Sequence, residues 1–170
     1  AVGIVLLVLL IYWSMQPSAP QDALDDLPRQ ADHGLDASVY TRVKVARAQQ
    51  YASAGTQYTN QIAIDLYNEL FKSYPDDTII QFGLARTLLT GIYQFNVDSL
   101  SLSQANSLSQ NLLASQPTNP DYLWLRGYYT EVSGNLDDAM TLYEEAVELA
   151  PTSAQKTLSL ARVMALKGRL

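Results

Sequence analysis

The feature that most constrains this chain of 170 residues is a recurring spacing between small residues and prolines. An alanine stands twelve residues before a proline in the pairs Ala63 and Pro75, Ala105 and Pro117, and Ala139 and Pro151. Ten residues beyond each proline another small residue follows: Ala85, Gly127 and Ala161. Pro117 and Pro151 are 34 residues apart, as are Ala105 and Ala139. Self-similarity at a fixed period of this length is typical of stacked helical repeats.

The spacing has a physical reason if each unit is a pair of packed helices. Small residues on the first helix (Ala48, Ala85, Gly127, Ala161) and on the second (Ala63, Ala105, Ala139) let the two helices approach closely. Larger residues then fill the gaps between layers: Tyr67, Phe71, Leu88, Leu112, Tyr143 and Leu149. Gly134 suits the positive φ that ends a helix, Asn135 suits the start of the next, and each proline ends a second helix. Because one hairpin cannot bury its own apolar face, neighbouring hairpins must stack.

This period and residue pattern resemble the tetratricopeptide repeat from about Ala37 to Leu170. We therefore expect an all-α helix-turn-helix solenoid of about three and a half repeats. The predicted helix pairs are 39–53 with 61–74, 78–90 with 100–116, and 122–133 with 136–149, and a last helix begins near Ser153. That helix either caps the array or leads into further chain. Long connections are expected at "AGTQYTN" and "GIYQFNVDSLS", and Arg126 and Thr130 stand where the repeat usually has large apolar residues.

The N-terminal stretch "AVGIVLLVLLIYW", residues 1–13, is uncharged and almost wholly aliphatic. It is shorter than the roughly 20 apolar residues of a membrane-spanning helix, so we interpret it as the C-terminal part of a single transmembrane helix before the solenoid. Tyr12 and Trp13 suit the lipid headgroup region. The apolar core of a signal peptide and a buried helix of the fold are the alternatives. Residues 14–36 are predicted to be a linker and residues 37–170 the repeat domain.

Composition excludes several function classes. The net charge of −6, with a pI of about 4.6, argues against nucleic acid as a partner. The chain has no cysteine, and its one histidine, His33, lies in the linker. We find no phosphate-binding loop, no serine elbow and no histidine pair, so we expect neither catalysis, nor a metal site, nor a cofactor. The acidic pairs Asp137–Asp138 and Glu144–Glu145 are interpreted as solvated helix positions.

A repeat array of this kind offers a concave groove lined by successive first helices. The repeat phase places these residues in it: Gln49, Phe82, Arg86, Leu89, Trp124, Tyr128, Glu131, Leu158 and Arg162. Arg86 and Arg162 flank two aromatic rings, so they are candidates to hold a peptide's carboxylate or carbonyls while the rings cover its apolar side chains. The alternative is that these aromatic residues are core between repeats.

The order of parts resembles the membrane-anchored tetratricopeptide subunits of bacterial cytochrome c maturation and haem-lyase systems. The residues that carry this resemblance are "FGLARTLLTG", the long insertion and "LSQNLLASQPTNPDYLWLRGYYTEVSGNLDDAMTLYEEAVELAP". The resemblance implies a single-pass protein of the bacterial inner membrane with a periplasmic repeat domain, which binds the C-terminal helix of an apocytochrome.

We therefore expect a non-enzymatic, membrane-anchored scaffold or chaperone-like adaptor that binds a peptide or helix of another protein, for example an apocytochrome or a haem-lyase subunit. Two alternatives to this expectation stay open. The first is a non-catalytic segment of a larger envelope-assembly enzyme or membrane sensor, and the second is a structural subunit of a membrane complex. The "FGLARTLL" segment and the later repeats also resemble the helical tails of periplasmic metallopeptidases, but the HExxH motif of those enzymes is absent from this sequence.

Overall fold

The computed structural model describes residues 37–96 and 99–168, and within these ranges the secondary structure is entirely helical. The helices are α2 (Ala37–Ser53), α3 (Gln57–Ser73), α4 (Thr78–Phe95), α5 (Ser99–Ser115), α6 (Pro120–Val132), α7 (Leu136–Leu149) and α8 (Ala154–Lys167). Residues Thr41–Leu170 form one compact unit. The all-α prediction is confirmed. The predicted transmembrane segment 1–13 and linker 14–36, with His33, lie outside the described residues, and no helix in the described ranges is both long and apolar enough to cross a membrane.

Short polar side chains begin most of these helices. Asp77 accepts hydrogen bonds from the backbone N–H of Ile79 at 2.8 Å and of Ile80 at 3.2 Å. Asn119 accepts from the N–H of Asp121 at 3.0 Å. Asn135 accepts from the N–H of Asp138 at 3.3 Å, and Gly134 before it has a φ of 86°. Such caps satisfy backbone donors that have no partner inside the helix, and the predicted roles of Gly134 and Asn135 are confirmed.

Two predicted connections are shorter than the sequence pattern indicated. Helix α3 begins at Gln57, not at residue 61, because Thr56 and Thr59 form a reciprocal capping box. Helix α4 continues to Phe95, not to residue 90, and ends at Asn96, whose φ is 55°. The expected loop "GIYQFNVDSLS" is therefore largely an extra turn of helix, which carries Tyr93 along the face of α4.

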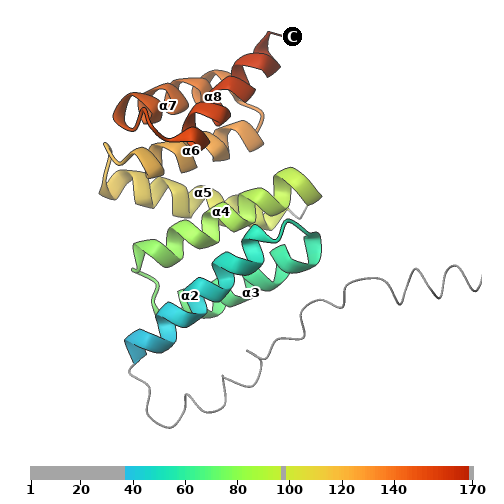
Figure 1. The fold of residues 1–170 in the computed structure, drawn as a ribbon, viewed down its shortest axis with the longest axis vertical. Coiled ribbons are helices and arrows are strands. Elements are labelled where there is room, and N and C mark those ends of the chain that lie inside the picture. The colour runs from blue at the N-terminus through green and yellow to red at the C-terminus, as the bar shows by residue number, and fades with distance from the viewer. Residues whose placement is uncertain (1–36, 97–98, 169–170) are drawn as a thin grey trace, which may run out of the picture. The chain divides into compact units, whose positions relative to one another are not determined.

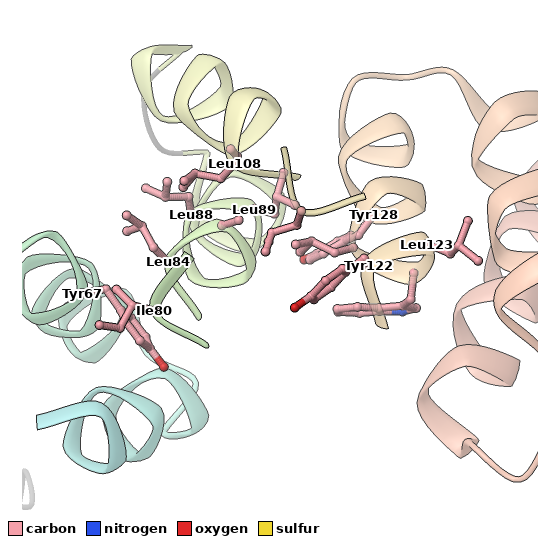
Figure 2. Close-up of a cluster of buried hydrophobic side chains, with 14 of the residues drawn as sticks. Tyr67, Ile80, Leu84, Leu88, Leu89, Leu108, Tyr122, Leu123 and Tyr128 are labelled. Carbon is pink, nitrogen blue, oxygen red and sulfur yellow. The ribbon is translucent and has the colours of Figure 1, made fainter. Parts of the chain in front are cut away.

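Consecutive helices pack as hairpins, and the hairpins follow one another along the chain (Figure 1). The first helices α4, α6 and α8 also contact their neighbours of the same kind, α4 with α6 and α6 with α8. Figure 2 shows the buried side chains that join these layers, from Tyr67 and Ile80 through Leu84 and Leu88 to Tyr122 and Tyr128. The core is thus continuous from one hairpin to the next, as a repeat array requires.

The small residues lie where the helices meet. Ala48, Ala63, Ala85, Ala105 and Ala139 have no exposed surface. The large residues Tyr67, Leu88, Leu112 and Tyr143 are buried beside them, and Phe71 packs against the same core. Two predictions need correction: Leu149 is 52% exposed, and Ala161 is exposed because no described helix packs on that face of α8.

The polar residues on α6 are accommodated by hydrogen bonds. Arg126 Nη1 donates to Asn106 Oδ1 at 2.6 Å and to Ser109 Oγ at 3.3 Å, both on α5. Its guanidinium lies 4.6 Å from the centre of the Tyr129 ring. Thr130 Oγ1 donates to the carbonyl of Gly127 at 2.8 Å. Arg126 thus links α5 to α6 by charge-assisted hydrogen bonds in place of apolar packing.

We predict that Gly127→Ala destabilises the fold. A Cβ at this position would lie 2.7 Å from Cε1 of Tyr143, a ring with no exposed surface. The two helices must then move apart, and overpacking of this kind costs about 1–3 kcal/mol of unfolding free energy. Urea denaturation measures the loss. Gly168→Ala is the control, because its nearest new contact, with the Met164 carbonyl oxygen, is 3.5 Å. Equal stability of the two variants would contradict the prediction.

Candidate functional site

A cleft of about 280 Å³ opens between the first helices α4, α6 and α8. Helix α4 contributes Arg86 and Thr90, and α6 contributes Trp124 and Tyr128. The remaining wall consists of Gln155, Leu158, Ser159 and Arg162 of α8. A cavity of this size is at the lower end of the range for small-molecule pockets. It holds one or two side chains of a bound segment, not a folded domain.

The structure brings together part of the predicted groove set. Arg86, Trp124, Tyr128, Leu158 and Arg162 line the cleft. Gln49 is exposed on α2, away from the cleft lining. Leu89 has no exposed surface and belongs to the core, so we remove it from the groove set. Arg86, three residues before it on the same helix, is half-buried and does line the cleft.

Two rings of the lining, Trp124 and Tyr128, form the aromatic floor of the cleft. Phe82 is not in the lining, and its ring centre is 6.4 Å from that of Trp124. The Trp124 ring is 5.6 Å from Tyr128, which in turn is 6.0 Å from Tyr93. Trp124 Nε1 donates to Ser159 Oγ at 3.0 Å, so α6 is tied to α8 below the surface. Figure 2 shows Tyr122 and Tyr128 projecting from the side of α6 that faces α4.

These rings serve the core as well as the cleft. Trp124 is only 5% exposed and Tyr128 only 7%. Burial raises the pKa of Tyr128 to about 12, an effect that a hydrogen bond with Thr90 partly opposes. A ligand in the cleft therefore touches the edges of a packed aromatic floor. Among the residues that line the cleft, Leu158 is the most accessible apolar side chain, and it is 69% exposed.

Glu131, which the sequence placed in the groove, lies beneath it and binds Arg162. Arg162 Nε donates to Glu131 Oε1 at 2.7 Å, and Nη2 donates to Oε2 at 2.6 Å. The hydroxyl of Tyr143 donates to the same Oε2 at 2.8 Å. The Glu131 side chain is 2% exposed and that of Arg162 is 38% exposed. The hydrogen bond with Glu131 raises the pKa of Arg162 above its ordinary value, so the guanidinium stays charged.

Arg86 differs from Arg162 in its surroundings. Its guanidinium lies 5.9 Å from the centre of the Phe82 ring. No ion pair joins Arg86 to a carboxylate within the described ranges, whereas Lys156–Asp121, Arg162–Glu131 and Lys167–Asp137 are ion pairs there. Arg86 therefore places in the cleft lining a guanidinium that forms no ion pair with a described carboxylate.

Sequence reasoning missed three lining residues, Thr90, Gln155 and Ser159. Thr90 follows Arg86 by four residues, and Gln155 and Ser159 lie three before and one after Leu158. Helical neighbours at such spacings share a face, which is the signal that would have found Thr90 and Gln155. Among the described residues there is no cluster of three or more acidic or imidazole side chains with the geometry of a metal site.

Comparison with known proteins agrees with this geometry. A family model described as tetratricopeptide repeat matches residues 101–154, which cover most of α5 and all of α6 and α7. The match covers helices α5 to α7 only, and the described residues form an all-α helical solenoid of the tetratricopeptide type of fold. No curated protein matches the chain in sequence.

Solved structures share the array's fold at low identity. A structure of MamA from Desulfovibrio magneticus RS-1 is 17% identical, with a TM-score of 0.58 over 75% of this chain and 66% of that one. The first repeat domain of Spaghetti (RPAP3), bound to the HSP90 peptide SRMEEVD, is 18% identical, with a TM-score of 0.55 over 75% of this chain and 93% of that one. A Thermobaculum terrenum O-GlcNAc transferase is 15% identical, with a TM-score of 0.60 over 77% of this chain but 23% of its own. These likenesses establish the fold.

We predict that Trp124→Ala lowers the free energy of unfolding of the array by about 3–5 kcal/mol, because it removes a buried ring and leaves a cavity. Urea denaturation tests this. The control is Leu158→Ala, which removes a side chain that is 69% exposed and should change stability by less than about 0.5 kcal/mol. A loss below about 1 kcal/mol for Trp124→Ala would show that the ring is a surface feature and not part of the core.

We predict that stability falls between about pH 10 and pH 12. Tyr128 keeps its proton in the folded array up to a pKa of about 12, whereas in the unfolded chain the hydroxyl ionises near its ordinary value of 10.0. The unfolded state loses protons first, so the free energy of unfolding declines over this range by up to about 1.4 kcal/mol per pH unit and per tyrosine. Burial also raises the pKa of Tyr143 and Tyr67.

Denaturation at a series of pH values measures this decline, and Tyr128→Phe should make it less steep. Tyr58→Phe is the matched control, because that ring is 65% exposed. An identical pH profile for Tyr128→Phe and the wild-type chain would contradict the assignment.

Proposed function

We propose that this chain is a non-enzymatic protein–protein interaction module that binds a short segment of a partner protein in the cleft between α4, α6 and α8. The observation that carries the proposal is the guanidinium of Arg86, which lacks a carboxylate partner among the described residues and stands at the rim of an aromatic floor. A charge in this position is satisfied by an acidic group of a ligand. The solved complex of the RPAP3 repeat domain with the acidic peptide SRMEEVD supports the same mode of use.

The cleft defines the chemistry of its ligand. Arg86 offers a charged fork for a carboxylate, and the exposed Leu158 offers an apolar contact on the opposite wall. The volume of about 280 Å³ accepts one or two side chains. The ligand is therefore a peptide or helix segment in which an acidic residue stands close to an aliphatic one.

We propose further that residues 1–13 hold this module in the bacterial inner membrane, with the array in the periplasm, and that its partner belongs to cytochrome c assembly. The support is the apolar composition of these residues and the layout that resembles the haem-lyase subunits. Tethering would raise the effective concentration of the cleft for partners at the same membrane. An apocytochrome or haem-lyase subunit is the partner expected on this proposal.

A second candidate is a non-catalytic segment of a larger enzyme. The observation that favours it is the likeness to the O-GlcNAc transferase, in which the matched region covers 23% of a longer chain. The length of the full gene product distinguishes the two candidates. A catalytic domain encoded in the same reading frame would favour the second.

Photo-crosslinking from Leu158 tests the proposed function. This position combines a place in the cleft lining with 69% exposure, so a photoreactive residue there does not disturb the core. The full chain is expressed in its native membranes, irradiated and purified, and the captured segment is sequenced. Capture of an apocytochrome or haem-lyase component supports the specific proposal. Capture of a different protein contradicts the assembly role but keeps the general one, and capture of none contradicts both.

We predict that Arg86→Gln reduces the crosslinked yield about tenfold or more without changing stability, because a charged hydrogen bond to the ligand is lost. Quantitative crosslinking and urea denaturation measure the two quantities. Arg42→Gln makes the same charge change on α2, which contributes no residue to the cleft lining, and should leave the yield unchanged. An equal fall for both variants would mean that net charge, not the cleft, controls capture.

A further inference from the structure

We propose that Glu131 decides how many acidic groups the cleft accepts. By occupying the Nε–Nη2 edge of Arg162, it leaves Arg86 as the cation of the described cleft lining that is open to a partner carboxylate. The cleft then selects a segment with a single carboxylate beside an aliphatic side chain and gains nothing from a second carboxylate. This inference rests on the proposed function and narrows its class of partner.

The Glu131–Arg162 contact uses the strongest binding edge of the guanidinium. Nε and Nη2 donate in parallel to the two oxygens of one carboxylate, at 2.7 and 2.6 Å. This bidentate arrangement is the one in which arginine binds carboxylates best. The guanidinium also lies 5.3 Å from the centre of the Tyr93 ring, so one of its faces is partly covered. A carboxylate of a ligand can therefore contact only the part of the Arg162 guanidinium that Glu131 and Tyr93 leave uncovered.

Glu131 is held in place and is not free to yield. Its side chain is 2% exposed, and it accepts a third hydrogen bond, at 2.8 Å, from Tyr143. The Tyr143 ring is itself fully buried and packs against Gly127. If a ligand drew Arg162 away, the carboxylate of Glu131 would remain buried without its counter-charge, which is strongly unfavourable. A ligand carboxylate therefore does not displace Glu131.

The charges of the cleft follow from this arrangement. Arg86 and Arg162 both line the cleft, but only Arg162 has a carboxylate bound to it. A second ligand carboxylate placed at Arg162 would also face the negative charge of Glu131, so attraction and repulsion oppose each other there. At Arg86 no described carboxylate is paired with the guanidinium to oppose this attraction. Removal of the charge on Glu131 should therefore allow Arg162 to bind a second carboxylate of the ligand.

The test uses the full chain, its Glu131→Gln variant and three probe peptides. The probes are acetyl-Gly-Leu-amide, acetyl-Gly-Leu with a free C-terminus, and acetyl-Asp-Leu with a free C-terminus, which carry no, one and two carboxylates. Glutamine keeps the size of the side chain and one acceptor oxygen, but it cannot accept two charged hydrogen bonds in parallel. Binding is followed by NMR through the indole N–H of Trp124, which lies at the cleft and donates to Ser159.

The wild-type chain should bind the one-carboxylate peptide more tightly than the amide and bind the two-carboxylate peptide within about twofold of it. In Glu131→Gln the two-carboxylate peptide should gain about tenfold, the effect of one added charged hydrogen bond, while the one-carboxylate peptide changes little. Tyr143→Phe is the matched control, because it removes a hydrogen bond to Glu131 but leaves the carboxylate on Arg162. It should keep the wild-type order of affinities.

Results of two kinds, one from the wild-type chain and one from the variants, overturn the inference and leave the proposed function intact. One is a wild-type chain that binds the two-carboxylate peptide about tenfold more tightly than the one-carboxylate peptide, a measurement that needs no variant to fold. The other is a folded Glu131→Gln protein with the wild-type order of affinities, or the same gain in Tyr143→Phe, which would indicate loosening of the array. If the wild-type chain prefers neither charged peptide over the amide, the proposed function fails and the inference falls with it.

Discussion

Close contact between paired helices, at residues with little or no side chain, is the constraint on which the rest of this structure depends. Gly127 shows how tight the contact is, since an added Cβ would lie 2.7 Å from the ring of Tyr143. Tyr143 reaches its place only because that space is empty, and from there its hydroxyl donates to Glu131. Glu131 in turn binds Arg162 of the next hairpin. The absence of a Cβ at Gly127 therefore affects the cleft wall through the contacts of Tyr143, Glu131 and Arg162.

Stability and recognition share the same residues in this array. Trp124 is 5% exposed and lies in the core, yet its edge forms part of the cleft floor and its indole fixes Ser159 of α8. Such a floor is rigid before any ligand arrives, and a rigid site loses little conformational freedom on binding. The adaptable parts are the exposed Leu158 and the guanidinium of Arg86. This division explains why a small cleft can be selective although most of its lining serves the fold.

The fold was largely predictable from the sequence, and the candidate site only in part. The spacing of alanines and prolines indicated the hairpins, because helix-to-helix distance depends directly on residue size. It did not indicate that α4 continues to Phe95. The helix ends at Asn96, which adopts the left-handed backbone conformation, and the spacing of small residues and prolines carries no information about that conformation. Of the groove residues, the phase placed Arg86 and Arg162 on one face. It also included Leu89, which is fully buried, because a repeat phase gives the direction of a side chain only to within a broad sector.

The sequence by itself determined that this chain forms helical hairpins that must stack, because small residues recur at a fixed period and one hairpin cannot bury its own apolar face. Only the tertiary structure decided which charges remain available. Glu131 and Arg162 are 31 residues apart, and nothing in their spacing along the chain shows that they form a bidentate pair. Arg86, by contrast, has no such partner among the described residues. Pairing of charges depends on distances between side chains of different hairpins, and those distances exist only once the hairpins are stacked.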